Sequence, residues 1–295
     1  MNLLKKDTKI LIVGLGLMGG SYAKALTNAG FGVKAITKNQ EDIDFALSEG
    51  FILGGSTEVT PETVAWADII VLALYPHTLV EWVGNYGKLI RPGTYVTDVT
   101  GVKRSVINAV SEAMPAGVEF IAAHPMAGRE SSGVKHSDAS VFHGANYIVV
   151  PTEKNTTRAI EICEELGKAM GFYRISRLDA EAHDKMVAFL SQLTHCIAVS
   201  LMCATETPGL EAYTGDSFRD LTRIARINDE MWSELFLWNK DALLSEMDRF
   251  EAQFDRLRTA LRQNDRETMR QMMRVSSDRR EKFDKPVIKK NERQD

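Results

Sequence analysis

Short apolar runs alternate with amphipathic stretches through the first 178 residues, and this alternation predicts strands separated by helices. The run at 9–13 is strand-length, and the helical pattern that follows it ends at Gly30. The same signals predict further strands at 32–37, 69–74, 95–99, 119–122 and 146–150, and helices at 19–29, 39–48, 78–90, 103–114 and 157–170. Because parallel strands need helical crossovers, this order predicts a parallel sheet with helices on both faces.

The pattern changes at about Asp179. Apolar residues then recur at spacings of three and four: Met186, Leu190, Leu193, Ile197 and Leu201. This stripe predicts one long helix over 179–205 with the stripe on its buried side. Further helices are expected at 218–226, 229–245, 246–262 and 265–283, and no strand pattern returns. We therefore predict an α/β fold with an N-terminal domain at 1–178, an all-helical domain at 179–285 and a polar tail at 286–295.

The helical half is rich in methionine and aromatic residues: Met186, Phe189, Met202, Met231, Trp232, Phe236 and Trp238. A helical block of this size has limited room to bury so many large apolar side chains by itself. Burial against a second subunit would cover the surplus, so we expect this helical block to pack against one.

A glycine loop, Gly14-Leu-Gly-Leu-Met-Gly19, joins the first predicted strand to the first helix. The first glycine permits a tight turn, the second lets the backbone approach a pyrophosphate, and the third lets the helix pack on the strand. A glycine-rich turn without a ligand is the alternative. With further strand–helix units after it, the loop favours a Rossmann-type dinucleotide-binding domain. We expect the cofactor at Gly14, Gly16, Leu17, Met18 and Gly19.

The end of the second predicted strand bears on cofactor choice. An NAD site usually has an acidic residue there that binds the ribose 2′-hydroxyl, whereas this chain has Thr37-Lys38-Asn39. We expect NAD or NADP, with a slight preference for NADP through Thr37 and Lys38. Alternatively, Lys38 is a surface lysine, and backbone or water holds the ribose. Tyr75 and Pro76, after the strand at 69–74, are also expected to contact the cofactor.

The carboxyl ends of further strands carry candidate catalytic groups, because ligands of open parallel sheets bind at that edge. The loop 98–103 would place Thr100 and Gly101 near a nicotinamide. His124 follows the strand at 119–122 beside Pro125, and a neutral imidazole there could take a proton from a substrate hydroxyl. The alternative for His124 is a structural role with a hydrogen bond to the backbone.

Two segments of the helical half carry further polar candidates. Gln192 and His195 share a face that lies away from the apolar stripe and suits an interdomain cleft, although a core histidine is the simpler interpretation. In the segment 215–226 the apolar residues Phe218, Leu221 and Ile224 should face the core. The charged residues then alternate around the helix: Arg219, Asp220, Arg223 and Arg226. A solvated charged face is the usual explanation, but a substrate carboxylate would require one of these arginines.

Composition narrows the class of protein. The 295 residues suggest two domains, and a net charge of −4 gives no basic field for nucleic acid. The apolar runs are shorter than the ~20 residues of a membrane span, so we expect no membrane association. Three cysteines without a CxxC pair favour reduced thiols in the cytoplasm. The N-terminal residues pass directly into a strand and predict no signal peptide.

Taken together, several motifs resemble the prephenate/arogenate dehydrogenases of tyrosine biosynthesis. They are Gly14–Gly19, His124-Pro-Met-Ala-Gly128 followed by Glu130 and Ser132-Gly133, Ser191-Gln-Leu-Thr-His195, and Phe218-Arg-Asp-Leu-Thr-Arg-Ile-Ala225 followed by Met231-Trp232. The resemblance extends over residues 9–285. The glycine loop is common to many families, whereas the HPMAG and FRDLTRIA segments are specific.

The resemblance implies oxidative decarboxylation of prephenate to 4-hydroxyphenylpyruvate, or of arogenate to tyrosine, with NAD or NADP as oxidant. His124 would accept the proton of the ring hydroxyl, Arg223 would bind a substrate carboxylate, and His195 would lie in the substrate cleft. Glu130 and Asp220 match polar positions around that cleft. Many members carry a serine at the position of Gly101, so Thr100 is the hydroxyl that could replace it. Helical domains of the family pair into dimers.

Alternatives remain open within and beyond this family. Arogenate differs from prephenate only by an amine in place of a keto group, and nothing in the sequence decides between them. A β-hydroxyacid dehydrogenase or imine reductase would use a lysine, such as Lys185, on the first long helix. A dinucleotide sensor without turnover is a third class. With only short segments before the first strand and after the helices, we expect tyrosine, if it inhibits, to act at the active site.

Overall fold

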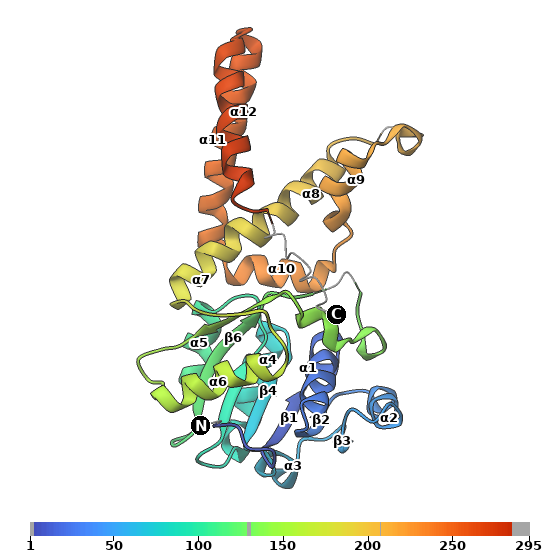
Figure 1. Cartoon of the computed structure of the whole chain (residues 1–295), viewed down its shortest axis with the longest axis vertical. Helices are drawn as coiled ribbons and strands as arrows, with labels where there is room; N and C mark the ends of the chain where they lie inside the picture. Colours follow the sequence, from blue (N-terminus) through green and yellow to red (C-terminus); the bar gives the residue numbers. More distant parts are fainter. Residues whose placement is uncertain (1–2, 129–130, 207, 285–295) are drawn as a thin grey trace, which may run out of the picture. The chain divides into compact units, whose positions relative to one another are not determined.

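The computed structural model describes residues 3–128, 131–206 and 208–284 of the chain, so Glu130 lies outside the described residues. The chain divides into two compact units, one through Leu243 and one from Leu244 onward (Figure 1). The first unit holds the sheet, its covering helices and the first part of the helical region.

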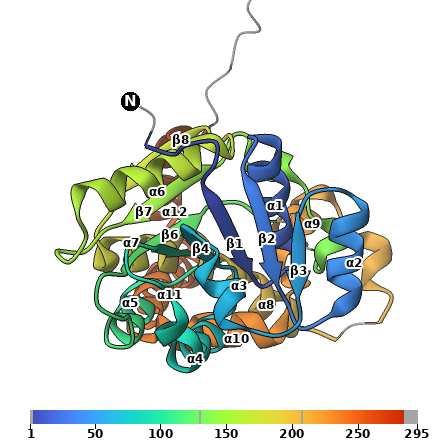
Figure 2. The same cartoon turned by 90° about the horizontal axis from the view of Figure 1, so that it is seen from below.

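The described residues form one eight-stranded sheet with the strand order β3-β2-β1-β4-β5-β6-β7-β8 (Figure 2). The strands are β1 (Lys9–Val13), β2 (Gly32–Ile36), β3 (Gly54–Ser56), β4 (Ile69–Leu72), β5 (Tyr95–Asp98), β6 (Glu119–Pro125), β7 (Asn146–Val150) and β8 (Arg174–Arg177). The order from β3 to β6 is all parallel, as expected for a Rossmann-type domain.

The prediction of a wholly parallel sheet is wrong at one edge. Strand β7 runs antiparallel to β6, with His124 opposite Ile148, and β8 is parallel to β7. The physical reason is the connection. Between β6 and β7 the described chain makes only the short 3₁₀ turns η2 (Val134–His136) and η3 (Ala139–Phe142), which return it without a helical crossover.

Two edge strands and one strand end escaped the sequence pattern. Strand β3 is Gly-Gly-Ser and β8 is Arg-Ile-Ser-Arg, so neither has an apolar run that would predict a strand. Strand β6 continues to Pro125, which places His124 inside the strand instead of after it. Its pairing with β7 therefore fixes the backbone of His124 on both sides of the histidine.

Helices cover both faces of the sheet, as predicted. They are α1 (Leu17–Asn28), α2 (Gln40–Ser48), the short α3 (Pro61–Ala65), α4 (Pro76–Tyr86), α5 (Arg104–Ser111) and α6 (Thr157–Ala169). One apolar cluster joins α1 and α6 to one face, through residues such as Tyr22 and Leu166. A second joins α4 and α5 to the other face, through residues such as Leu79 and Val106. The central strands β1, β4 and β5 between them are largely buried, as a parallel sheet requires.

The helical region begins with a continuous helix of 24 residues, Ala180–Cys203. It consists of α7 (Ala180–Val187), a π-helical turn (Ala188–Gln192, η4) and α8 (Leu193–Cys203). The chain continues through α9 (Asp216–Thr222), the 3₁₀ turn η6 (Arg223–Ala225), α10 (Asp229–Trp238), α11 (Lys240–Arg262) and α12 (Arg266–Glu281). The predicted helix break near Ser245 is wrong, because the break falls at Asn239.

The continuous helix bears on two expectations. It is long and apolar enough, by length and composition alone, to cross a membrane, although no single apolar run in the sequence reaches that length. It also departs from the predicted stripe in its middle: Leu190 is 43% exposed and Gln192 is 1% exposed, whereas the stripe residue Leu193 is buried at 5%. The π turn is the physical reason for the second difference, because it shifts the register of the helix in its middle.

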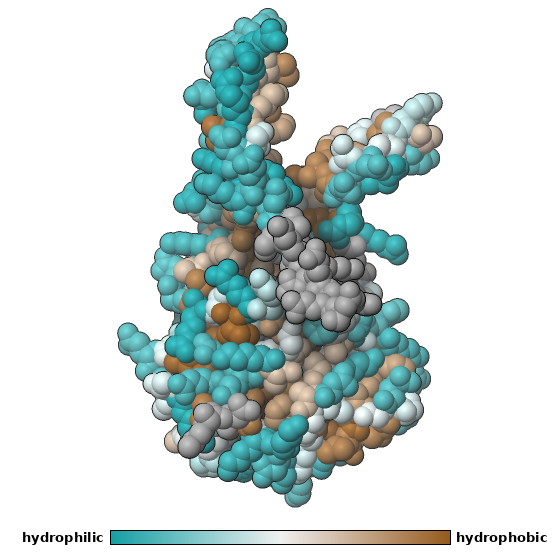
Figure 3. All heavy atoms as spheres, viewed as in Figure 1, coloured by the Kyte–Doolittle hydropathy of each residue, from teal (hydrophilic) through white to brown (hydrophobic). Residues whose placement is uncertain are grey.

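Large apolar side chains lie on the surface of the helical region (Figure 3). Phe218 and Leu221 of α9 are exposed and do not face a core within the chain, contrary to prediction. In the second unit, α11 and α12 form a two-helix hairpin that exposes Phe254, Leu261 and Met273. Its turn passes through Asn264 at φ 56°, and the Asp265 side chain caps α12 by accepting the N–H of Thr268.

Candidate active site

The glycine loop lies between β1 and α1, at the carboxyl end of the parallel strands. Gly14 has φ +94°, and a Cβ there would lie 2.4 Å from the carbonyl oxygen of Ala73. A Cβ on Gly19 would lie 1.9 Å from the carbonyl oxygen of Gly14, so helix and loop are in direct backbone contact. A Cβ on Gly16 would have no neighbour within 4 Å, and Gly16 caps α1 without a side chain. The loop therefore offers an open approach to the N–H groups of α1, which fits a pyrophosphate.

The two other predicted cofactor segments lie on neighbouring strand ends. Thr37, Lys38 and Asn39 follow β2, and Lys38 and Asn39 are exposed. The Asn39 amide donates to the Asp42 carboxylate at 3.2 Å, so the first acidic groups belong to the first turn of α2. Tyr75 and Pro76 form the start of α4, next to the loop residue Ala73 that Gly14 contacts.

The helical region is attached to this edge of the sheet through α10. The carboxylate of Glu234 accepts the backbone N–H of His77, in the first turn of α4, at 2.5 Å. At the C-terminal end of α10, the Ser105 hydroxyl donates to the carbonyl oxygen of Trp238 at 3.0 Å. Figure 1 shows α10 lying across the end of the sheet. These contacts position α10 over the carboxyl ends of β4 and β5.

His124 is the first of three side chains that are linked by hydrogen bonds. Its Nδ1 lies 2.8 Å from Nε2 of His183, and Nδ1 of His183 lies 2.8 Å from Oδ1 of Asp184. The Asp184 carboxylate also accepts the N–H groups of Lys103 and Arg104 at the start of α5. We call His124, His183 and Asp184 the proton chain. The first residue comes from the sheet, and the other two come from α7.

The proton chain fixes the protonation of both rings when they are neutral. A carboxylate only accepts, so His183 carries its proton on Nδ1 and offers the lone pair of Nε2. His124 then donates its Nδ1 proton to that lone pair, and its own Nε2 is left as an acceptor. The ring atom that can receive a proton is therefore Nε2 of His124, which lies 3.9 Å from the place of a Cβ on Gly101.

Electrostatics keep His124 neutral. Burial lowers the pKa of His124 well below its ordinary value, and the neighbouring His183 and the Lys103 cation lower it further. Burial also lowers the pKa of His183, and the hydrogen bond that His183 donates to the Asp184 carboxylate opposes this shift. An imidazole with a lowered pKa is already deprotonated at neutral pH, which is the form that a general base requires.

A fully buried ion pair supports the same strand ends. Lys103 Nζ donates to Oδ2 of Asp98 at 2.6 Å, and both side chains have 0% exposure. Oδ1 of Asp98 accepts the N–H of Ala123, the residue before His124, at 3.0 Å. Burial lowers the pKa of Lys103, and the Asp98 carboxylate opposes this shift. The pair therefore fixes the loop after β5 to the strand that carries His124.

The hydroxyl of Thr100 makes its hydrogen bonds within this loop. It donates to Asp98 and lies 2.9 Å from the carbonyl oxygen of Val102, and it accepts from Lys103 Nζ at 3.1 Å. Thr100 is 4% exposed. The structure therefore does not present it as a replacement hydroxyl beside His124. Gly101, in contrast, borders His124 directly, and Leu235 of α10 lies 3.6 Å from the place of its Cβ.

His195 lies beside the same helix α10. Its ring stacks on Trp232 with centroids 3.7 Å apart, and its Nδ1 lies 2.8 Å from the carbonyl oxygen of Ser191. The turn η6, which contains Arg223, packs against α8. Arg223 and Asp220 are both exposed. The structure thus gathers His124, His195 and the Arg223 turn around α7, α8 and α10, while Glu130 lies outside the described residues.

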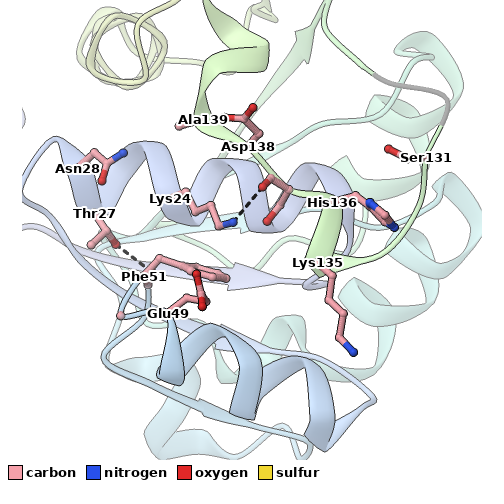
Figure 4. A pocket seen from close by; sticks show the side chains of 12 residues that line it. Lys24, Thr27, Asn28, Glu49, Phe51, Ser131, Lys135, His136, Asp138 and Ala139 are labelled. Carbon is pink, nitrogen blue, oxygen red and sulfur yellow. Dashed lines mark hydrogen bonds between the residues drawn. The ribbon is translucent and has the colours of Figure 1, made fainter.

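A hollow of about 620 Å³ lies elsewhere on the sheet domain (Figure 4). Lys24, Thr27 and Asn28 line it from the C-terminal half of α1, whereas the glycine loop is at the opposite end of that helix. Its charged side chains are of both signs, with Lys135 and Glu49 among them. We assign it no part in the reaction.

Sequence reasoning missed His183, Asp184 and the role of Lys103. A His-Asp pair at 183–184, one turn after the helix-capping Asp179, was the available signal. No spacing rule connects such a pair to a histidine 59 residues earlier. Lys185, the lysine that another dehydrogenase class would use, is exposed and pairs with Glu181 at 2.6 Å.

Two protein families together match most of the chain, from residue 22 to residue 275. Residues 22–176 match the family described as "Prephenate dehydrogenase, nucleotide-binding domain". Residues 179–275 match the family described as "Prephenate dehydrogenase, dimerization domain". The prephenate dehydrogenase of Bacillus subtilis is 30% identical over 285 residues, which are 94% of this chain and 76% of that protein. The cyclohexadienyl dehydrogenase of Zymomonas mobilis is 28% identical over 87% of this chain and 89% of its own length.

A solved structure agrees with these matches. It is that of the prephenate dehydrogenase from Aquifex aeolicus in complex with hydroxyphenyl propionate and NAD⁺. Its TM-score with this chain is 0.88 at 27% sequence identity, and the match covers 95% of this chain and 99% of that one.

Proposed function

This chain belongs to the prephenate dehydrogenase family of NAD(P)-dependent oxidoreductases, and we propose that it converts prephenate to 4-hydroxyphenylpyruvate and CO₂. The observation that carries the proposal is the proton chain, which leaves Nε2 of a neutral His124 as an acceptor beside Gly101. The residues of the glycine loop, Thr37, Lys38, Tyr75 and Pro76 would hold the dinucleotide. The nicotinamide, when bound, accepts the hydride from ring C4 of the substrate.

In this proposal, Nε2 of His124 accepts the proton of the C4 hydroxyl as the hydride leaves. The new positive charge on His124 is stabilised through Nδ1–H, which donates to His183 and so connects to the Asp184 carboxylate. The ring carboxylate leaves as CO₂, its bonding electrons make the ring aromatic, and His124 returns the proton to the phenolic oxygen. Aromatisation supplies the driving force, and the protein mainly orients the substrate.

The direct test is turnover followed by the near-ultraviolet absorbance of the reduced nicotinamide. Prephenate and arogenate are each assayed with NAD⁺ and with NADP⁺. We expect kcat/KM to be highest with prephenate. Exclusive use of arogenate would replace the substrate assigned here, and cofactor binding without turnover of either substrate would make the chain a dinucleotide sensor.

We assign Arg223 to a substrate carboxylate and place His195, Asp220 and Glu130 around the same substrate; Glu130 lies outside the described residues. The Arg223 turn packs on α8, the helix of His195. Arg223→Ala should raise the KM for prephenate by about 10–100-fold, because a charge-assisted hydrogen bond worth roughly 1.5–3 kcal/mol is lost. The KM for the dinucleotide should not change. The neighbouring Arg226→Ala is the matched control, and an equal effect of both variants would remove the assignment of Arg223.

For the cofactor we propose dual use with a preference for NADP⁺. The support is the Thr37-Lys38-Asn39 segment, which has no carboxylate at the end of β2. An exposed contact between Lys38 and a 2′-phosphate would contribute on the order of 1 kcal/mol, which is about tenfold, and it would weaken as salt is added. Backbone contacts alone would give no preference.

The variant Thr37→Asp should shift the preference toward NAD⁺, because an aspartate there accepts from the ribose hydroxyls and repels a 2′-phosphate. The measurement is kcat/KM for both cofactors in the wild type and the variant. Thr37→Asn is the matched control, with similar size and no charge. A wild type that prefers NAD⁺ a hundredfold would show that Lys38 is a surface lysine.

We also propose that residues 179–285 form a helical domain through which two chains form a homodimer. The support is the set of exposed apolar side chains on α8, α9 and the α11–α12 hairpin, Met202, Leu221, Phe254 and Leu261 among them (Figure 3). Such a surface is unusual for a monomer.

A cytoplasmic location accords with cysteines that the described part of the chain holds as free thiols. Tyrosine, which shares the phenol and carboxylate of the product class, would compete with prephenate.

A further inference from the structure

The helix Ala180–Cys203 carries residues of the site on both sides of its π turn. His183 and Asp184 precede the turn, and His195 follows it. Within the turn, the N–H of Leu193 donates to the carbonyl oxygen of Ala188, five residues earlier. A π turn is equivalent to one extra residue inserted into an α-helix, so everything after it is rotated relative to everything before it.

The rotation has a consequence for the two histidines, which are twelve residues apart in the sequence. At about 100° per residue, an uninterrupted α-helix would place them roughly 120° apart around the axis, whereas one inserted residue reduces the difference to roughly 20°. The π turn therefore brings His195 to the side of the helix that carries His183. The same arithmetic brings Gln192 to the side of Asp184.

Contacts with α10 agree with this register. The Asn239 amide donates to the carbonyl oxygen of Asp184 at 2.9 Å and to Oε1 of Gln192 at 2.8 Å. Nε2 of Gln192 in turn donates to the carbonyl oxygen of Leu235 at 2.9 Å. Gln192 and Asn239 are 1% and 6% exposed. Buried amides whose hydrogen bonds connect two helices strongly favour one relative placement of those helices.

One side of α10 contacts the site at three successive positions. Trp232 stacks on His195, Leu235 lies over Gly101 beside His124, and Asn239 lies against Asp184. These residues are spaced by three and four, so they form one face of α10. Along this face, Leu235 beside His124 therefore comes between Trp232 at His195 and Asn239 at Asp184, and Gln192 is bonded to both Leu235 and Asn239.

We infer that the π turn, together with the Gln192–Asn239 amide pair, is a positioning device for the reaction: it sets His195 and Trp232 in register with His124. The inference rests on the proposed function. Gln192 and Asn239 are positioning residues in it, because they act through His195, Trp232 and the backbone of Asp184. For the π turn itself, the essential element is the presence of one extra residue, and not the identity of the exposed side chains in the turn. The amide side chains of Gln192 and Asn239 are the second element.

The experiment removes the extra residue. Deletion of Leu190, which is exposed, should close the π turn into an α-helix and rotate α8 by about 100° relative to α7. We expect kcat/KM for prephenate to fall by on the order of 10²-fold or more, because small displacements of positioning groups have effects of that size. NAD⁺ affinity measured by calorimetry should remain within about twofold, since the glycine loop is untouched. The matched control, Leu190→Ala, keeps the chain length and should behave like the wild type.

A second variant covers the case in which the deleted chain does not fold. Gln192→Met keeps the volume and removes both hydrogen bonds of the amide. Assayed below its unfolding transition, it should lower kcat and raise the KM for prephenate without changing NAD⁺ affinity. Gln192→Glu, which can still accept from Asn239, should recover part of the activity. Wild-type kinetics in Gln192→Met, or equal losses in Leu190→Ala and the deletion, would overturn the inference.

A readout without substrate separates this inference from the proposed function. The stacked His195 and Trp232 rings contribute to near-ultraviolet circular dichroism, and the difference spectrum between wild type and Trp232→Phe isolates that contribution. The Leu190 deletion should lose it, and Leu190→Ala should keep it. If wild type turns over no prephenate but the deletion loses the signal, the proposed function fails and the register stands. If the deletion keeps the signal, the register is wrong whatever the substrate.

Discussion

Replacing His124 with asparagine should lower kcat by about 10²–10⁴-fold, the usual contribution of a general base, and leave the KM for prephenate within a few-fold. Asparagine retains a polar group of similar size but cannot accept and return a proton at Nε2. The measurement is steady-state turnover with saturating dinucleotide. His136→Asn, in η2 outside the proton chain, is the matched control and should keep wild-type turnover. Equal kcat for His124→Asn and wild type would exclude His124 as the base.

The pH profile of the wild type tests the same assignment. Because burial and the neighbouring His183 and Lys103 lower the pKa of His124, the neutral form persists to lower pH than for an ordinary histidine. The acidic limb of kcat/KM should therefore lie below the ordinary histidine range, and activity should fall as pH drops through it. An acidic limb above that range would show that the group that titrates is not this buried ring.

Replacing Lys103 with methionine should lower the free energy of unfolding by about 3–5 kcal/mol, because it leaves the Asp98 carboxylate buried without its cation. The double variant Lys103→Met/Asp98→Asn removes both charges, and it should recover much of this loss, since a buried ion pair stabilises little relative to neutral groups of the same size. Urea unfolding of both variants and of Asp98→Asn gives the cycle. A loss below about 1 kcal/mol for Lys103→Met would show that water reaches the carboxylate.

The fold was largely predictable from the chain because most elements before Asp179 have a local signal. The glycine loop and the apolar strands placed β1, α1, β4 and β5 correctly within a few residues. The antiparallel β7 was not predictable, because strand direction depends on the connection after His124 and not on the apolar run itself. The edge strands β3 and β8 have no apolar run, and pairing with a neighbour alone defines them.

The site was less predictable, for a physical reason. His124 could be singled out, because a strand end is visible in the sequence. Its partners His183 and Asp184 are brought to it only by the packing of α7 on the sheet, over a separation that no periodicity records. Leu190 is exposed and Gln192 is buried, against the predicted stripe, while Leu193 is buried as predicted. The π turn changes the register at this point, and the spacing of three and four gives no signal of it.

The origin of the proton chain in two parts of the sequence limits how this protein can be recombined. His124 and Lys103 come from the dinucleotide-binding part, whereas His183 and Asp184 come with the first turns of the helical part. A chimera that joins this sheet to the helices of a distant relative would inherit half of its acid–base machinery from each parent. The junction that matters for function is then the surface between α5 and α7, and not the peptide bond at which the two genes are spliced. Exchange of the helical part should preserve activity only where the new helices also supply His and Asp at positions 183 and 184, and where the start of α5 still donates its N–H groups to that Asp.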